Sequence, residues 1–315
     1  MLDRIASIFD YTLIHATIRS STPILLAALS AVITQQANIL NVGVEGIMLF
    51  GAFTAVCVSF FTGSWILAVL AAMAVGVLVS TIIGFAHLKY KADVFAVGTV
   101  INMLAIALTR FLLNTILKSS GSFYSAEIVP IPTINIRFLE KIPVLDSLFN
   151  KYSLFEVLGI VIVFILWYAL YKTVWGLRIR SVGLNPMAAE TAGLNVFKAK
   201  FQVILISGML GGMAGAHLSL GYSKLFAENM TNGRGFMGVA AMFFGGANPV
   251  FAWIGSLIFG LADSIGARLQ AYGLPSQFIL MIPYIATIAI LTISLASRIR
   301  QERKQKSSLN NLPNN

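Results

Sequence analysis

The sequence has few charged residues, one cysteine and three histidines, and each scarcity excludes a class of protein. Charged residues make up 11% of the 315 residues, whereas about 25% is usual for a soluble domain. A water-soluble globule of this length could not cover its surface with so few charges. The single cysteine, Cys57, excludes an intramolecular disulfide framework and a multi-cysteine metal site. His15, His87 and His217 lie far apart in the chain, so we expect no histidine metal centre.

Long apolar stretches are abundant. Apolar residues make up 57% of the chain and the mean hydropathy is +0.84, the opposite of the pattern typical of disorder. A helix needs roughly 20 mainly apolar residues to cross a bilayer. The candidate spans are 22–40, 43–62, 65–87, 93–117, 154–175, 201–221, 235–247, 249–270 and 276–297. We therefore expect an all-α polytopic membrane protein with about eight to ten transmembrane helices.

One of these stretches, 235–247, is too short for a full span. It is rich in glycine and methionine, and the chain continues as Gly-Gly-Ala-Asn-Pro up to Pro249. This composition predicts a half-helix or a broken helix. Irregular backbone at membrane depth is tolerated only where it is buried in protein or lines a cavity.

The net charge of +10 indicates topology, because the basic residues cluster in three segments. These are the loop with Lys89 and Lys91, the loop flanked by Lys172, Arg178, Arg180, Lys198 and Lys200, and the tail with Arg298, Arg300, Arg303, Lys304 and Lys306. The positive-inside rule places all three in the cytoplasm, including the C-terminus. The loops 118–152 and 222–234 are then external. The charge is thus no evidence for nucleic-acid binding.

The two ends of the chain differ from the apolar middle. Residues 3–20 mix charged and apolar positions, which predicts an amphipathic helix at the membrane interface. Simple parity of crossings places this helix outside, whereas a re-entrant segment around 38–48 would place it inside. No signal peptide is evident. We expect residues 1–297 to form a single transmembrane domain and the basic tail 298–315 to be disordered.

Catalytic and energy-coupling motifs are missing. No G-x-x-x-x-G-K-[ST] phosphate loop, H-E-x-x-H or G-x-S-x-G motif occurs. Only Glu45 and Asp263 lie well inside candidate spans, which is little for a proton or sodium relay. If the protein moves a solute uphill, we expect the energy to come from elsewhere. An ion-coupled carrier and a membrane-embedded enzyme are the alternatives of another class.

The cytoplasmic loop 177–200 contains a short predicted helix. Asn185 is a good N-cap and Pro186 suits the first helical position. Gly193 is a natural stop just after the last turn, and Asn195 can cap the next helix. A helix this short is marginal in isolation, so we expect it to dock against something. An ordinary connector is the plainer interpretation.

This loop resembles the coupling helix of ABC-importer permeases, which inserts into a groove of the ATPase subunit. The pattern is Gly183-x-Asn185-Pro186-x-Ala188-Ala189-x-x-x-Gly193, similar to that of the branched-chain amino-acid, sugar and nucleoside permeases. The general importer signature has a glutamate before the two alanines. Here Glu190 follows them, as it also does in the sugar and nucleoside branch.

Two further segments extend the resemblance. Residues 37–52 resemble the first-half signature of simple-sugar and nucleoside permeases, and residues 233–249 resemble the matching second-half signature. The Asn41-x-Gly43-x-Glu45-Gly form is similar to the branch served by Bmp-type nucleoside-binding lipoproteins. The two halves also echo each other weakly, since Met-Leu-Phe-Gly at 48–51 parallels Met-Phe-Phe-Gly at 242–245.

The resemblance implies a permease subunit of an ATP-driven importer in a bacterial cell membrane. Its partners would be an ATPase, a second related permease in a heterodimer, and an extracytoplasmic binding lipoprotein. The chain itself would bind no cofactor, because ATP would be used by the ATPase. Nucleosides are the expected substrate, with simple sugars as the alternative.

Polar residues inside spans are costly and usually face the bundle interior. Gln35, Asn38, Asn41 and Glu45 form an unusually polar run, and Asn102 lies within another span. We hypothesise that they line the substrate pathway. Asn38, Asn41 and Glu45 would share one face if this segment is helical. The alternative is that these side chains only join helices to one another.

Aromatic side chains are the other pathway candidates. Phe50 and Phe244 are expected to line the pathway, and Phe236 and Phe243 have the same ability to stack on a nucleobase. Aromatic residues at helical spacing are more often core or lipid-facing. His217 is expected to be a packed or interfacial residue near the outer end of its span.

Overall fold

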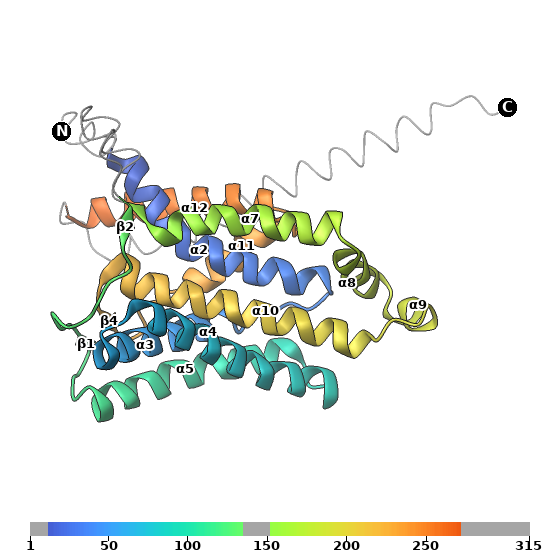
Figure 1. The fold of residues 1–315 in the computed structure, drawn as a ribbon, viewed down its shortest axis with the longest axis horizontal. Helices are drawn as coiled ribbons and strands as arrows, with labels where there is room; N and C mark the ends of the chain where they lie inside the picture. Colours follow the sequence, from blue (N-terminus) through green and yellow to red (C-terminus); the bar gives the residue numbers. More distant parts are fainter. Residues whose placement is uncertain (1–11, 135–151, 272–315) are drawn as a thin grey trace.

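The computed structural model describes residues 12–134 and 152–271, and in this part of the chain it is almost entirely helical (Figure 1). The long helices are α2 (Thr12–Gln36), α3 (Val44–Thr62), α4 (Trp65–Gly84), α5 (Val94–Ile116), α7 (Leu154–Lys172), α10 (Val196–Ala216) and α12 (Pro249–Ala271). The shorter ones are α8 (Val174–Leu184), α9 (Pro186–Thr191) and α11 (Arg234–Phe244). Two π-helical segments, η2 (Phe85–Lys89) and η4 (His217–Ser223), extend α4 and α10.

Four two-residue strands tie the loops together at one end of the bundle. β1 (Ser122–Phe123) pairs antiparallel with β4 (Phe226–Ala227), and β2 (Thr133–Ile134) pairs antiparallel with β3 (Tyr152–Ser153). The short helices α8 and α9 lie at the opposite end (Figure 1). We call these the strand end and the α9 end of the bundle.

The membrane prediction is confirmed. Seven of the described helices are long and apolar enough to cross a bilayer, and α11 is a shorter apolar helix, as expected for 235–247. Two expected segments, the span 276–297 and the tail 298–315, lie outside the described residues.

The N-terminal expectation needs a correction. Residues 12–20 are not a separate interfacial helix, because α2 begins at Thr12 and continues without a break into the first span. Its polar residues are accepted inside the bundle, where Ser20 Oγ donates to the carbonyl of Gly260 at 2.8 Å. The rest of the predicted interfacial helix, 3–11, lies outside the described residues.

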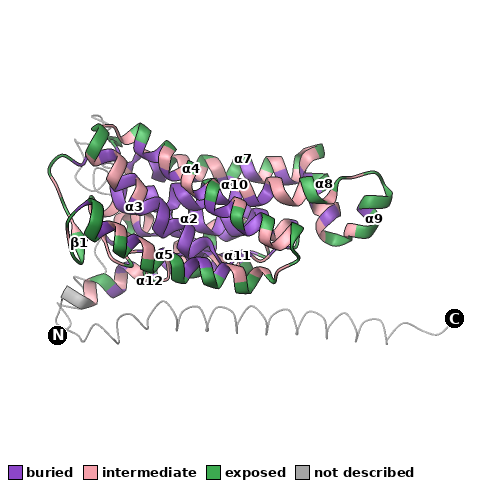
Figure 2. Cartoon of the chain, turned by 90° about the horizontal axis from the view of Figure 1, so that it is seen from below, coloured by how far each residue is buried: buried purple, intermediate pink, exposed green. Residues whose placement is uncertain are grey.

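The helices differ in how far they are buried, with a central group and a peripheral group. Within one apolar stretch of 18 residues in each span, 72–83% of the residues are buried in α2, α3 and α10 with η4, against 33–44% in α4, α5, α7 and α12. Figure 2 shows the buried residues concentrated along α2, α3 and α10. The central helices therefore hold the polar positions that lipid would not tolerate.

Glycines let the central helices approach closely. An added Cβ at Gly51 of α3 would lie 2.6 Å from the carbonyl oxygen of Gly212 in α10. Gly76 of α4 meets the backbone of Gly208 in the same way. Small residues are the usual means by which membrane helices pack, because lipid provides no hydrophobic driving force between helices.

Candidate translocation and coupling sites

The polar run after α2 forms a break between two helices. α2 ends at Gln36, the chain turns through a left-handed conformation at Asn38 (φ +56°), and α3 begins at Val44. The backbone is not helical between these helices, so Asn38, Asn41 and Glu45 do not share a helical face as they would in a continuous helix. Asn38 is exposed, whereas Asn41 and Glu45 are buried.

Glu45 joins the first turn of α3 to the first turn of α11. Its Oε1 accepts a hydrogen bond from the backbone N–H of Gly233 at 2.8 Å, and its Oε2 accepts one from Gly235 at 2.6 Å. An added Cβ at Gly235 would lie 2.6 Å from the Glu45 Cα, so the two helix starts are in direct contact. The carboxylate thus caps a helix that is far away in sequence, where backbone donors would otherwise be unpaired.

The junction lies deep in the bundle. Gly238 of α11 packs against Ala27 of α2, and the carbonyl of Ala247, just after α11, accepts a hydrogen bond from Gln36 Nε2 at 2.7 Å. The two helices therefore run in the same direction, and Gly235 is level with the middle of α2. A half-helix that starts at such a depth is typical of central transport sites.

Two asparagines stabilise the break. Asn41 Oδ1 accepts from the N–H of Gly43 at 3.1 Å, and its Nδ2 donates to Ser207 Oγ of α10 at 3.1 Å. Asn102 of α5 accepts from the N–H of Gly46 at 2.8 Å and donates to the carbonyl of Val42 at 3.1 Å. Both amides therefore satisfy backbone groups that the break leaves open.

The remaining predicted pathway residues are not gathered at this junction. Phe50 is buried in the central core, and Phe244 packs near Gly255 of α12 while staying half-buried. Gln35 is half-buried at the end of α2. On α11, Phe236 and Phe243 have exposed fractions of 43% and 46%. They are seven residues apart, so they share one open face of the half-helix.

The loop at the α9 end has the predicted capping. Asn185 Oδ1 accepts from the N–H of Ala188 at 3.1 Å, with Pro186 in the first helical position. Gly193 follows the helix with φ +83°, and Asn195 Oδ1 caps α10 through the N–H of Lys198 at 2.8 Å. Local sequence is sufficient for these features because each cap involves neighbours in the chain.

The surface of α9 divides into an inner and an outer side. Ala189 is buried against its own chain, whereas Met187, Ala188 and Glu190 are exposed, Met187 with an exposed fraction of 79%. An exposed methionine beside an alanine provides an apolar contact area that a single copy of this chain leaves open.

Gly183 connects this loop to the end of α2. An added Cβ at Gly183 would overlap the carbonyl oxygen of Gln36. The amide of Gln36 also donates to Tyr171 Oη at 3.3 Å, and the guanidinium of Arg180 lies 5.0 Å from the centroid of the Tyr171 ring. The α8–α9 segment is therefore in backbone contact with the helix that leads into the break.

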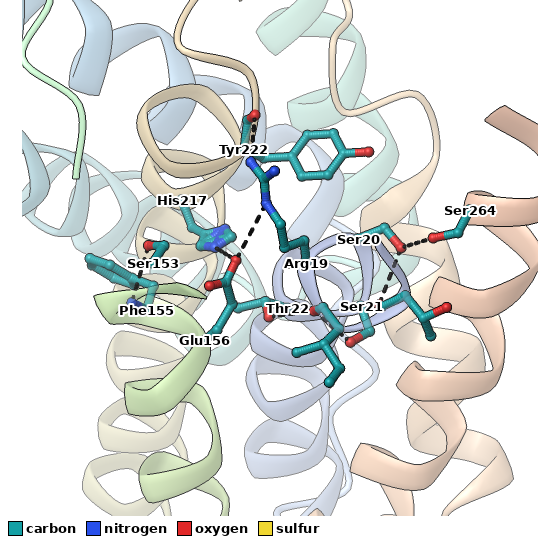
Figure 3. A network of polar contacts seen from close by, with 12 residues as sticks. Arg19, Ser20, Ser21, Thr22, Ser153, Phe155, Glu156, His217, Tyr222 and Ser264 are labelled. Atoms are coloured by element: carbon teal, nitrogen blue, oxygen red, sulfur yellow. Dashed lines mark hydrogen bonds and ion pairs between the residues drawn. The ribbon is translucent and has the colours of Figure 1, made fainter. Parts of the chain in front are cut away.

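A charged network closes the strand end (Figure 3). Glu156 of α7 lies 3.9 Å from Arg19 of α2 and 3.7 Å from His217 of η4. Glu156 and His217 are both buried, and burial together with the Glu156 carboxylate raises the pKa of the nearby Tyr152 to about 12. His217 is packed, as expected, but its partner was not found from sequence, because Glu156 is the third residue of its helix and looks like an ordinary first-turn acid.

A second ion pair continues this network. Arg234 Nη2 donates to Asp263 Oδ2 at 2.9 Å, joining α11 to α12. The guanidinium groups of Arg19 and Arg234 lie 5.6 and 5.8 Å from the centroid of the Tyr222 ring. The two ion pairs thus meet at one tyrosine, and together they link five helical elements.

These features define a class of protein. A bundle of apolar helices, with a broken helix and a half-helix that start together at depth and an exposed helical loop at one end, is the architecture of a multi-pass membrane transport protein. The chain belongs to the family described as branched-chain amino acid transport system, permease component, whose model matches residues 13–291. The resemblance stated from the three sequence segments is thereby confirmed. As a permease component, the chain is not the subunit that hydrolyses ATP, and it works with ATPase and binding-protein partners.

Two relatives and one solved structure are similar over nearly the whole chain. The guanosine ABC transporter permease protein NupQ of Bacillus subtilis is 38% identical over 89% of this chain and 91% of its own length. The nucleoside ABC transporter permease protein NupC of Lactococcus lactis is 37% identical over 89% and 90%. A solved inward-facing ABC transporter has a TM-score of 0.50 at 15% identity, covering 91% of this chain and 85% of that one, and supports the fold alone.

Proposed function

We propose that this protein is the nucleoside-translocating permease subunit of an ATP-driven importer. The observation that carries the proposal is the 38% identity with a guanosine permease over 89% of the chain. The substrate would cross by alternating access, with the energy supplied by ATP binding and hydrolysis in the partner subunit. The protein's own part is to bind, orient and release the nucleoside.

The coupling step would use the α9 end. We assign the ATPase-contacting role to Gly183, Asn185, Pro186, Ala188, Ala189, Glu190 and Gly193, and we place this end and the C-terminus in the cytoplasm. The exposed side of α9 would enter the ATPase groove. Its movement would reach α2 through the backbone contact between Gly183 and Gln36, and then the break that Asn41 and Asn102 stabilise.

The pathway would run along the open face of α11. Phe236 and Phe243 lie on this face of a half-helix that begins at the depth of the middle of α2, and an aromatic ring can stack on any nucleobase. A second, related permease would supply the opposite wall in a heterodimer. Gln35, Asn38, Phe50 and Phe244 remain pathway candidates, whereas Asn41, Glu45 and Asn102 would hold the shape of the wall.

Uptake of radiolabelled guanosine tests the substrate. Cells that lack their own nucleoside uptake would express this chain with its ATPase, second permease and binding protein. We expect ATP-dependent guanosine uptake that excess unlabelled adenosine or uridine reduces and excess ribose does not. Saturable uptake of ribose or glucose, without nucleoside uptake, would show instead that the protein is a sugar permease.

Substitution on α9 tests the coupling. Ala188→Arg places a long charged side chain on the exposed side of α9, so we expect the ATPase to be lost on co-purification and uptake to fall at least tenfold. The matched control is Ala96→Arg, at another exposed alanine of the α9 end. Equal ATPase capture by both variants would contradict docking through α9.

Truncation on α11 tests the pathway. Phe236→Ala and Phe243→Ala remove stacking partners, which are worth about 1–3 kcal/mol per base, so we expect KM for guanosine to rise about tenfold or more. Phe251→Ala, at a phenylalanine of α12 with an exposed fraction of 56%, should leave KM unchanged. An unchanged KM in both α11 variants would exclude this face from the pathway.

A further inference from the structure

We infer that the hollow between α8 and the start of α10 binds the phosphate headgroup of an anionic phospholipid. The hollow has a volume of about 360 Å³. Two of its lining side chains are cations, Arg178 from α8 and Lys198 from α10, and none of its lining residues is acidic. Neither cation has a carboxylate partner within the two described parts of the chain. Two unpaired cations that share one hollow make a site for an anion with several oxygen acceptors.

The hollow lies at the level of the lipid headgroups. The span Val196–Ser223 has 28 residues and is therefore roughly 42 Å long at the usual rise of an α-helix. The hydrocarbon core of a bilayer is only about 30 Å thick. The excess places part of this span outside the hydrocarbon core, and we assign the first turn of α10 to the headgroup layer because Lys198 would be costly in hydrocarbon. Trp175, which donates from Nε1 to Gln202 Oε1 at 3.4 Å, also lines the hollow, and tryptophan is typical of this layer.

Apolar side chains beside each cation suit the acyl part of a lipid. Leu177, next to Arg178, has an exposed fraction of 56%, and Phe197, next to Lys198, has one of 43%. Phe197 stacks on Phe201, which in turn contacts Phe85 of η2. These apolar side chains do not line the hollow; they form a neighbouring surface of α8, α10 and η2 that acyl chains would cover once the headgroup is held between the cations.

The position of α9 distinguishes this site from the surface that would meet the ATPase. α9 projects farther from the bundle than α8 and the first turn of α10 do (Figure 1). Of the residues assigned to the ATPase contact, Gly193 alone also lines the hollow, whereas Arg178 and Lys198 do not belong to that set. A soluble partner on the exposed side of α9 therefore borders the hollow at Gly193 without needing its two cations. The inference does not depend on the proposed substrate, because it rests on the membrane setting and on this hollow alone.

Lipid retention by the purified full chain tests the site. In phosphatidylcholine nanodiscs with a minor fraction of phosphatidylglycerol, we expect native mass spectrometry to detect retained phosphatidylglycerol. Arg178→Gln and Lys198→Gln should each weaken retention about fivefold, the usual effect of one basic residue at an anionic surface. Lys172→Gln, at an exposed lysine of the same end that does not line the hollow, should change nothing. Retention by both hollow variants equal to that of the control would overturn the proposal.

A second measurement needs no charge substitution. Brominated phosphatidylglycerol should quench the fluorescence of Trp175. The quenching should be seen in the wild type and be lost in Trp175→Phe, and brominated phosphatidylcholine should quench less. Quenching that is equal for both lipids would overturn the proposal. Binding of glycerol 3-phosphate to the chain in pure phosphatidylcholine nanodiscs distinguishes a lipid from a soluble phosphate as the ligand. Binding of glycerol 3-phosphate at micromolar concentration would also overturn the proposal. Loss of ATPase capture in the hollow variants with unchanged lipid retention would make the hollow a protein-docking surface instead.

Discussion

The two ends of the bundle are held together by different kinds of contact. At the strand end, charged and polar side chains from five helical elements meet around Glu156 and Tyr222. At the α9 end, the contacts are helix caps and a glycine that lets two backbones touch. The strand end brings opposite charges of its own side chains together, Arg19 beside Glu156 and Arg234 beside Asp263, whereas the α9 end leaves apolar and basic groups exposed.

This difference fits two mechanical roles. A buried ion-pair network has strict geometric demands, so it holds one arrangement until enough binding energy is supplied to break it. A short capped helix on a backbone contact is easily displaced and can follow a partner. We therefore expect substitutions at the strand end to lower the stability of the protein, and substitutions on α9 to act mainly on partner binding.

The largest effect is expected from Arg19→Ala. Removing the guanidinium leaves the buried Glu156 carboxyl group without its neighbouring cation. Because the Arg19 side chain has an exposed fraction of 35%, we expect a loss of about 2–3 kcal/mol of unfolding free energy, below the range for fully buried pairs. Denaturant unfolding in detergent micelles measures the loss. Adding Glu156→Gln to Arg19→Ala should recover part of it. Glu127→Ala, an exposed charge at the same end, is the control, and an equal loss in both single variants would contradict a network that stabilises this end.

A smaller loss is expected from Gly183→Val. The new side chain would overlap the Gln36 carbonyl, and overpacking of this kind costs about 1–3 kcal/mol. Guanosine uptake should fall together with stability, because α8 would be pushed away from α2. Leu184→Val, at the exposed neighbouring position, should leave both unchanged. A stable Gly183→Val protein with normal uptake would show that this backbone contact transmits nothing.

Loss of the α9 cap comes next. Asn185→Ala removes the acceptor for the Ala188 N–H and should destabilise α9 by about 1 kcal/mol. Amide hydrogen exchange in α9 should quicken about fivefold, while the midpoint of global unfolding barely moves. Asn185→Ser keeps a capping oxygen and should exchange like the wild type. Slow exchange in the alanine variant would mean that packing, not capping, holds this helix.

The smallest effect is expected from the exposed ion pair of the strand end. Arg110 and Glu228 lie 3.3 Å apart, but the Arg110 side chain has an exposed fraction of 67%. Exposed pairs contribute about 0–1 kcal/mol and are screened by salt. Arg110→Ala should therefore change the unfolding free energy by less than about 0.5 kcal/mol. A loss as large as that of Arg19→Ala would remove the distinction between buried and exposed charges at this end.

Local patterns predicted much of the fold. The apolar runs gave the spans, the short run 235–247 gave the half-helix, and Asn185, Pro186 and Gly193 gave the capped α9. Each of these depends on residues that are close together in the chain. The start of the first span was placed too late, because the polar residues Arg19 and Ser20 resemble an interfacial segment until their partners are known.

The candidate site was predicted less completely. Its polar residues were identified, but the role of Glu45 was not, because the backbone donors that it accepts from belong to Gly233 and Gly235. No periodicity or motif links positions so far apart. The Glu156–His217 contact was missed for the same reason, as was the overlap of Gly183 with the end of α2.

The sequence by itself determined that this protein belongs in a membrane, which described segments are long enough to cross it apart from the start of the first one, and which loop is a capped helix. Hydrophobicity and capping act over a few residues and can be read in order. Only the tertiary structure decided which polar groups stabilise the two ends and the break between α2 and α3. Deep in an apolar bundle a charge or an unpaired backbone group needs a partner. Which partner is near depends on how the helices pack, and the order of residues along the chain does not reveal it.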